Sequence, residues 1–209
     1  MTMELLILTA LALTFVGSRW IDFLYKLPTA PLSFPDEIQS RARFRLPLLA
    51  IILIGTFINF AQVQMPFQFY LMAANFFLAL IIFTDFEQYV IFDRMLLPFA
   101  GVGILALIHL DLPLADRFAA ALIGGGVFFL IALITHGGIG GGDVKLVFVL
   151  GIWLGVENLL RVVIMACIAG GVVAILLILF KQKDRKSYFA YGPYFALAAM
   201  YILFCAKTL

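Results

Sequence analysis

The stretch from Leu46 to Thr84, 39 residues long, contains no Asp, Glu, Lys or Arg. A helix that crosses the hydrocarbon core of a bilayer needs about 20 apolar residues, so this stretch is long enough for two crossings. Gln62, Gln64 and Pro66 interrupt it and mark the turn between the two. The chain is therefore expected to fold within a lipid bilayer.

Further apolar runs continue this pattern along the whole chain. Hydrophobic residues make up 65% of the sequence and charged residues only 12%, whereas soluble domains average about 25% charged residues. The other expected spans are Leu5–Leu24, Met95–Leu110, Phe118–Thr135, Leu146–Val156, Val162–Phe180 and Ser187–Ala206. Together with the first pair, they predict an all-α polytopic membrane helix bundle with about eight transmembrane helices.

This bundle is expected to be one integral-membrane domain over residues 1–209, with Thr29–Arg45 as a cytoplasmic loop. The first apolar run has no basic start and no small-residue cleavage site after it, so we expect a retained helix rather than a cleaved signal. Cys167 and Cys205 lie inside apolar runs and predict neither a disulfide nor a zinc site. A net charge of only +2 gives no indication of nucleic-acid binding.

The basic residues predict how the bundle is oriented. If the eight spans alternate, eleven of the fourteen Lys and Arg residues fall on one side. Short cytoplasmic loops carry an excess of Lys and Arg, so that side is predicted to be cytoplasmic and both termini external. The group includes four residues of the last loop, Lys181, Lys183, Arg185 and Lys186.

A glycine-rich segment, GIGGGDVKL (Gly138–Leu146), separates two of the apolar runs. Irregular backbone at the membrane must be buried in protein or line a wet cavity. Gly140 and Gly142 allow unusual backbone angles and leave room for an extended substrate strand to approach. Lys145 follows Asp143 by two residues, and it either helps to keep that acid ionised or reaches the membrane interface as an ordinary lysine.

Two acids on the predicted cytoplasmic side need an explanation, because carboxylates beside membrane helices are costly and often functional. Asp85 ends the third predicted span and Asp143 opens the sixth. Glu87 and Asp93 lie in the predicted loop that follows the third span. Two carboxylates held close together share a proton, so that one can activate water and the other can donate to a carbonyl. The helix dipole favours Asp143, at a helix N-terminus, as the base and Asp85, at a C-terminus, as the acid.

At these residues the chain resembles the type IV prepilin peptidases, bacterial inner-membrane aspartyl proteases of the Gly-x-Gly-Asp class. Four stretches are similar to motifs of that family: Gly140–Leu146, Asp85–Asp93, Tyr191–Ala196, and Gly17-Ser18 with Tyr25–Pro28. The resemblance implies that Asp85 and Asp143 are catalytic and that Gly140, Gly142, Lys145, Glu87 and Asp93 contact the substrate. The Tyr191-Gly192-Pro193 segment either borders the cleft or is only a helix-breaking turn.

The chain also departs from the family pattern. Phe92 replaces a proline, Ile21 replaces an asparagine, and Thr29–Arg45 lacks the paired cysteines with which large members are expected to hold zinc. Many such members also methylate the new N-terminus, using S-adenosylmethionine. We therefore expect a short form with no metal and no cofactor, and S-adenosylmethionine would be needed only if methyltransferase activity were kept.

The resemblance implies a membrane endopeptidase that cleaves the leader of prepilins or pseudopilins after a glycine, as in type IV pilus or type II secretion systems. Cleavage would occur at the cytoplasmic face of the inner membrane, with the lipid bilayer and the substrate as partners and an oligomeric state that the sequence leaves open. The alternatives are a presenilin-like intramembrane protease, a small proton-coupled transporter, or an inactive maturation factor. Asp85 follows Thr84 rather than a tyrosine, which argues against the first, and no carboxylate falls in the middle of a span, which argues against the second.

Overall fold

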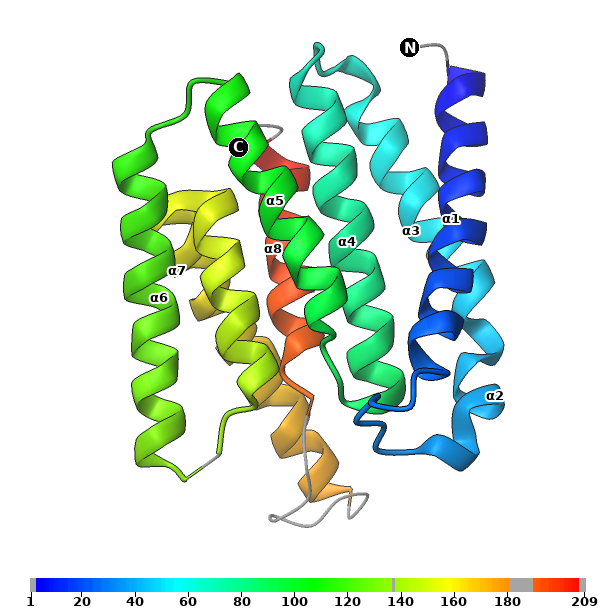
Figure 1. The fold of residues 1–209 in the computed structure, drawn as a ribbon, viewed down its shortest axis with the longest axis vertical. Coiled ribbons are helices and arrows are strands. Elements are labelled where there is room, and N and C mark those ends of the chain that lie inside the picture. The colour runs from blue at the N-terminus through cyan, green and yellow to red at the C-terminus, as the bar shows by residue number, and fades with distance from the viewer. Residues whose placement is uncertain (1–2, 137, 181–189, 207–209) are drawn as a thin grey trace.

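The computed structural model describes residues 3–136, 138–180 and 190–206, and over these residues the chain is helical with no strand (Figure 1). The α-helices are α1 (Met3–Tyr25), α2 (Ile38–Arg41), α3 (Arg45–Asn59), α4 (Phe67–Gln88), α5 (Asp93–His109), α6 (Leu114–Ile134), α7 (Gly141–Leu179) and α8 (Gly192–Ala206). Short 3-10 helices are η1 (Pro35–Glu37), η2 (Ala42–Phe44) and η3 (Phe60–Gln62). The all-α prediction is confirmed.

Every apolar run that the sequence marks as a span contains a helix, and these helices cover most of its described residues. Five helical stretches are long and apolar enough to cross a membrane on length and composition alone, and Gly192–Cys205 is a shorter apolar helix. The count of eight spans therefore stays a prediction. The start of the last expected span at Ser187, and the basic residues Lys181, Lys183, Arg185, Lys186 and Lys207, lie outside the described residues.

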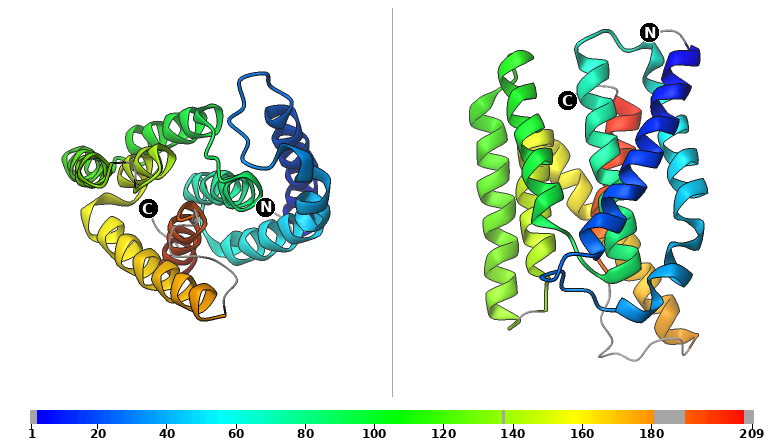
Figure 2. Two further views of the ribbon diagram at one scale, coloured as in Figure 1. Left: turned by 90° about the horizontal axis from the view of Figure 1, so that it is seen from below. Right: turned by 45° about the vertical axis from the view of Figure 1, so that its right-hand side comes forward.

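Helix α4 forms the centre of the bundle. It packs against α1, α3, α5 and α8, and the view along the bundle shows α4 and α8 enclosed by the other helices (Figure 2). Most of its residues are buried. A helix that is hydrophobic all round belongs in such a position, and its polar residues must then find partners inside the protein.

Helix α7 is two helices joined at a break. Gly155 has φ 74° and ψ 178°, which is not helical, and the chain turns back there so that the two halves run in opposite directions (Figure 1). Arg117 of α6 donates to the carbonyl of Trp153, and Asp116 accepts from the N–H of Val156 at 3.4 Å. These two side chains bond to backbone groups on either side of the break, and the two halves of α7 correspond to the two separate apolar runs of the sequence.

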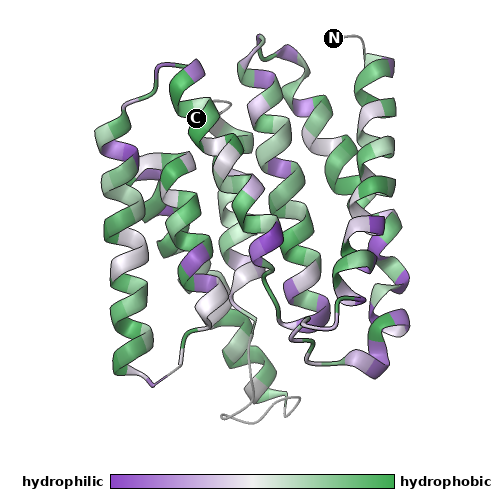
Figure 3. Cartoon of the chain, in the orientation of Figure 1, coloured by the Kyte–Doolittle hydropathy of each residue, from purple (hydrophilic) through white to green (hydrophobic). Residues whose placement is uncertain are grey.

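The two ends of the bundle differ. Helix α1 begins and α8 ends at the same end, and α4 ends and α7 begins toward the other (Figure 1). Hydrophobic residues line the long helices, and many of the hydrophilic ones lie toward the end where α2 and the last turn of α4 lie (Figure 3). The segment expected as a loop, Thr29–Arg45, contains η1, α2 and η2, and Arg45 is already the first residue of α3.

Candidate active site

Asp85 lies in the last turns of the central helix α4. Its side chain is buried, with 6% of the residue exposed. Helix α4 continues to Gln88, three residues beyond Asp85, and ends with Tyr89 in a left-handed conformation (φ 54°). Among the described residues, Oδ2 of Asp85 has no hydrogen-bond partner. A buried polar atom without a partner is uncommon and often marks a site that binds water or substrate.

Asp143 lies in the first turn of α7. Its N–H donates to the carbonyl of Gly140 at 3.0 Å, which closes the turn that begins the helix. A Cβ atom on Gly140 would lie 3.1 Å from Oδ2 of Asp143, so the glycine leaves the space that this carboxylate occupies. Oδ1 of Asp143 is also buried without a hydrogen-bond partner among the described residues.

The structure brings the two acids together although they are far apart in the sequence. The carboxyl groups of Asp85 and Asp143 interact electrostatically. Ile91 packs between the elements that carry them. A Cβ atom on Gly142 would lie 3.1 Å from Cβ of Ile91, and one on Gly192 would lie 2.9 Å from its Cδ1. The ends of α4, α7 and α8 therefore meet at one place, as the sequence predicts for Asp85 and Asp143.

A pocket of about 360 Å³ lies beside this place. It is lined by Leu27 and residues 29–31 after α1, by residues 90–94 at the junction of α4 and α5, and by Gly142 and Lys145 of α7. Three of the residues that the sequence suggests for substrate contact, Asp93, Gly142 and Lys145, therefore share one pocket. Its lining is part polar and part apolar. Such a lining can contact both the polar backbone and the apolar side chains of a peptide.

Lys145 is paired with Asp93 across this pocket. Its Nζ donates to both carboxylate oxygens at 2.8 Å, and the two side chains are 57% and 59% exposed. The sequence suggests that Lys145 either supports Asp143 or is an ordinary interface lysine, and the structure gives it a third role as the link between the starts of α5 and α7. The link arises because Asp93 begins α5 where that helix packs against α7.

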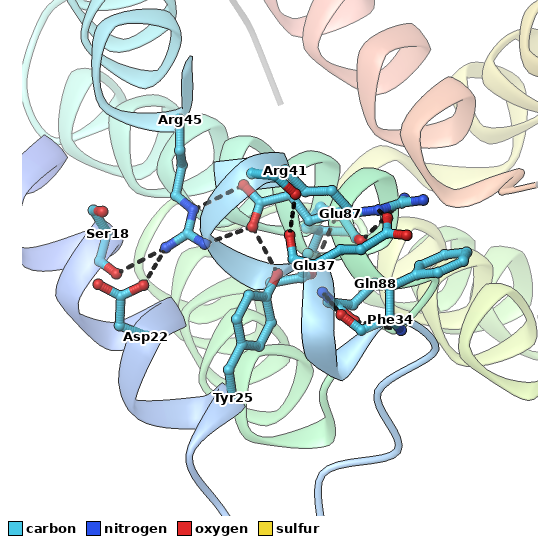
Figure 4. A network of polar contacts seen from close by, with 12 residues as sticks. Ser18, Asp22, Tyr25, Phe34, Glu37, Arg41, Arg45, Glu87 and Gln88 are labelled. Carbon is cyan, nitrogen blue, oxygen red and sulfur yellow. Dashed lines mark hydrogen bonds and ion pairs between the residues drawn. The ribbon is translucent and has the colours of Figure 1, made fainter. Parts of the chain in front are cut away.

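Glu87 is not in a loop, as the sequence had suggested, but in the last turn of α4. It is 2% exposed and accepts hydrogen bonds from Arg45 and from Tyr25 (Figure 4). It does not line the pocket described above. In the sequence, Arg45 is recognisable only as one of the basic residues of the predicted cytoplasmic side. The one signal was its position directly before the charge-free run, where a basic residue is more often an interface residue.

The described part of the chain holds no group of three or more His, Cys, Asp or Glu side chains that is arranged to hold a metal ion. The expectation of no zinc stays a prediction. Ile21, which stands where the resemblance implies an asparagine, is fully buried in α1. An apolar, enclosed side chain offers no hydrogen bond to a methyl donor, and the expectation about S-adenosylmethionine stays a prediction.

Comparison with known proteins finds similarity to the family that the sequence motifs resemble. The model of the type IV leader peptidase family matches residues 72–175, a range that contains both Asp85 and Asp143. A prepilin leader peptidase/N-methyltransferase of Bacillus subtilis is 35% identical over 130 residues, covering 60% of this chain and 50% of the relative. That of Xanthomonas campestris pv. campestris is 27% identical over 131 residues, covering 60% of this chain and 46% of the relative.

A longer match is found with the prepilin leader peptidase/N-methyltransferase of Neisseria gonorrhoeae. It is 27% identical over 180 residues, covering 81% of this chain and 60% of the relative. The chain thus spans about half the length of the curated relatives that it matches. No solved structure matches it.

Proposed function

We propose that this chain is a membrane aspartyl endopeptidase that cleaves the leader of type IV prepilins or pseudopilins, because its residues 72–175 match the model of the type IV leader peptidase family. Asp85 and Asp143 are its catalytic residues. The observation that carries the proposal is the pair of carboxylates at the meeting point of α4 and α7, each with one buried oxygen that has no partner among the described residues.

The chemistry follows from two neighbouring carboxyl groups that share a proton. The ionised one, which we assign to Asp143, accepts a proton from a water molecule as the water oxygen attacks the scissile carbonyl carbon. The protonated one, Asp85, donates to the carbonyl oxygen and so stabilises the tetrahedral intermediate. As this intermediate collapses, the C–N bond breaks, Asp143 gives the proton it took from water to the leaving amine, and Asp85 takes a proton back from the hydroxyl group that becomes the new carbonyl. The start of α7 favours the anion at Asp143 because helix N-termini carry partial positive charge.

The pocket beside the dyad is the proposed site for the extended part of the substrate. Its lining includes Gly142, the residue directly before Asp143, and Ile91, which packs against both Gly142 and the start of α8. Gly140 and Gly142 present backbone with no side chain in the way. Asp93 and Lys145 offer one charge of each sign to the substrate at the exposed edge.

The substrate class comes from the names of the relatives and from the motifs that the chain shares with the family. A prepilin leader is cut next to the apolar helix that anchors the pilin in the membrane, and the dyad here lies at the end of apolar helices. We propose cleavage after a glycine at the cytoplasmic face of a bacterial inner membrane, with both termini of this chain external. Buried Ile21 and the cysteine-free segment 29–45 support a peptidase without methyltransferase activity.

Cleavage of prepilins by the purified protein in detergent tests this function. The expected product is a mature pilin whose mass corresponds to a cut after the leader glycine, without the added mass of a methyl group. A cut inside the apolar helix would instead favour a presenilin-like protease. Intact substrate, across several prepilin and pseudopilin leaders and with folded enzyme, would contradict the peptidase proposal.

A further inference from the structure

An ion pair is fully enclosed in the N-terminal half of the bundle. Arg45 and Glu87 are each 2% exposed, and the guanidinium donates to both carboxylate oxygens at 2.8 and 2.5 Å (Figure 4). Removing two charges from water is expensive, and a buried ion pair is therefore a weak source of stability. Its presence in a chain with so few charges calls for a different explanation.

The pair joins three helices. The same guanidinium donates to Asp22 of α1 at 2.6 Å and to the carbonyl of Ser18 at 3.4 Å. The hydroxyl of Tyr25, at the end of α1, donates to Glu87 at 3.0 Å. Glu87 of α4 is thus held from α1 and from the first residue of α3, with its carboxylate oxygens in a fixed orientation.

The backbone at the end of α4 is held from the same direction. The last carbonyl groups of a helix have no partner within the helix, and helix ends therefore fray. Here Arg41 donates to the carbonyl of Glu87 and the N–H of Ser33 donates to that of Gln88, both at 3.3 Å. The side chain of Gln88 exchanges two hydrogen bonds with the backbone of Phe34, at 2.8 and 3.0 Å.

Glu87 lies two residues after Asp85 in the same helix. Successive helical residues are turned by about 100°, so the two side chains point in nearly opposite directions. Glu87 faces α1 and α3, and Asp85 faces the start of α8, where Gly192 contacts it. The network therefore holds the last turn of α4 on the side of the helix opposite Asp85, and so affects the position and the rotation of that turn.

We propose that Arg45 and Glu87 are positioning residues for Asp85. By fixing the last turn of α4 against α1 and α3, they hold the Asp85 carboxylate in position beside the Asp143 carboxylate. The proposal rests on the proposed peptidase function for its kinetic consequence, but not for the anchoring itself. It also replaces substrate contact as the role of Glu87, since that carboxylate is buried, does not line the pocket and is bonded on both oxygens within the protein.

A kinetic comparison separates positioning from substrate binding and from stability. We would measure kcat and KM for prepilin cleavage by Glu87→Gln and by the double variant Arg45→Met with Glu87→Met. The double variant is expected to stay folded because it leaves no buried unpaired charge, since Asp22, the other partner of Arg45, is 45% exposed. The matched control is Glu157→Gln, which removes an exposed ion pair with Arg161 on the second half of α7. Positioning predicts that kcat falls roughly 10- to 100-fold in both variants, with little change in KM and none in the control. A raised KM with unchanged kcat, or wild-type kinetics in the folded double variant, would overturn the proposal.

Hydrogen exchange followed by mass spectrometry provides a readout that does not depend on activity. The amides of residues 84–89 are expected to exchange faster in Glu87→Gln than in the wild type, and to be unchanged in Glu157→Gln. Equal protection in all three proteins would show that the network does not hold this turn. If the wild type cleaved no prepilin, the peptidase function would fail while this measurement would still decide the anchoring.

Discussion

Gly192, at the start of α8, lies so close to Asp85 that a Cβ atom on it would be only 2.6 Å from Oδ2 of the carboxylate. The same atom would be 2.9 Å from Cδ1 of Ile91. Side-chain carbons do not approach other heavy atoms this closely without displacing them. The contact shows that the Tyr191-Gly192-Pro193 segment borders the site from the side of α8, and that glycine leaves the room in which Asp85 lies.

Gly192→Ala is therefore expected to move the Asp85 carboxylate and to lower kcat for prepilin cleavage by about tenfold or more. A displaced acid is still present and still buried, so the thermal unfolding midpoint should change little although kcat falls. Gly171→Ala is the matched control, since a Cβ atom on that helical glycine meets nothing within 4 Å. Equal rates for the two variants would show that the contact with Gly192 has no influence on the chemistry.

The ion pair between Asp93 and Lys145 is predicted to affect substrate binding more than stability. Because both side chains are more than half exposed, water and salt screen the pair and it contributes at most about 1 kcal/mol to the free energy of unfolding. Asp93→Asn and Lys145→Gln should raise KM by up to about tenfold, which equals about 1.4 kcal/mol of binding, with smaller changes in kcat. Kinetics at low and high salt measure this effect, and Arg161→Gln is the control. An unchanged KM at low salt would show that neither residue contributes to substrate binding.

Gly155 is predicted to be indispensable for the break in α7. Its φ of 74° and ψ of 178° belong to a region that only glycine adopts readily, and other residues pay about 1–3 kcal/mol to enter it. A Cβ atom there would also collide with the Asp116 carboxylate. Gly155→Ala should lower the free energy of unfolding by at least this amount, as measured by unfolding in detergent. Stability equal to that of Gly171→Ala would mean that α7 can turn back without this conformation.

The helices of this fold are readable from the sequence because a helix satisfies its own backbone hydrogen bonds, which a bilayer requires. Apolar runs long enough to span therefore mark α1, α3, α4, α5 and α6 directly, and the two halves of α7 appear as two runs. The start of α7 at Gly141 was also open to prediction, since the glycine loop and Asp143 mark a helix N-terminus. These features depend on local sequence alone.

The contacts that build the site depend on tertiary structure instead. Arg45 and Glu87 are 42 residues apart, and nothing in either neighbourhood distinguishes a buried pair from two interface charges. The sequence around Asp116 and Arg117 gives no sign of a structural role, yet these two side chains bond to backbone groups on both sides of the break in α7. Side-chain partners of this kind are chosen by how helices pack, so composition and periodicity do not reveal them.

The central claim is that Asp85 and Asp143 act together on one water molecule. The most direct test compares prepilin cleavage by the wild type, Asp85→Asn and Asp143→Asn, each purified in detergent and shown to be folded, with the product mass read by mass spectrometry. The account predicts cleavage by the wild type and a loss of activity in both variants to near the limit of detection, because an amide can neither accept the proton of water nor share a proton with its neighbour. Full activity in either folded variant would contradict the two-aspartate dyad.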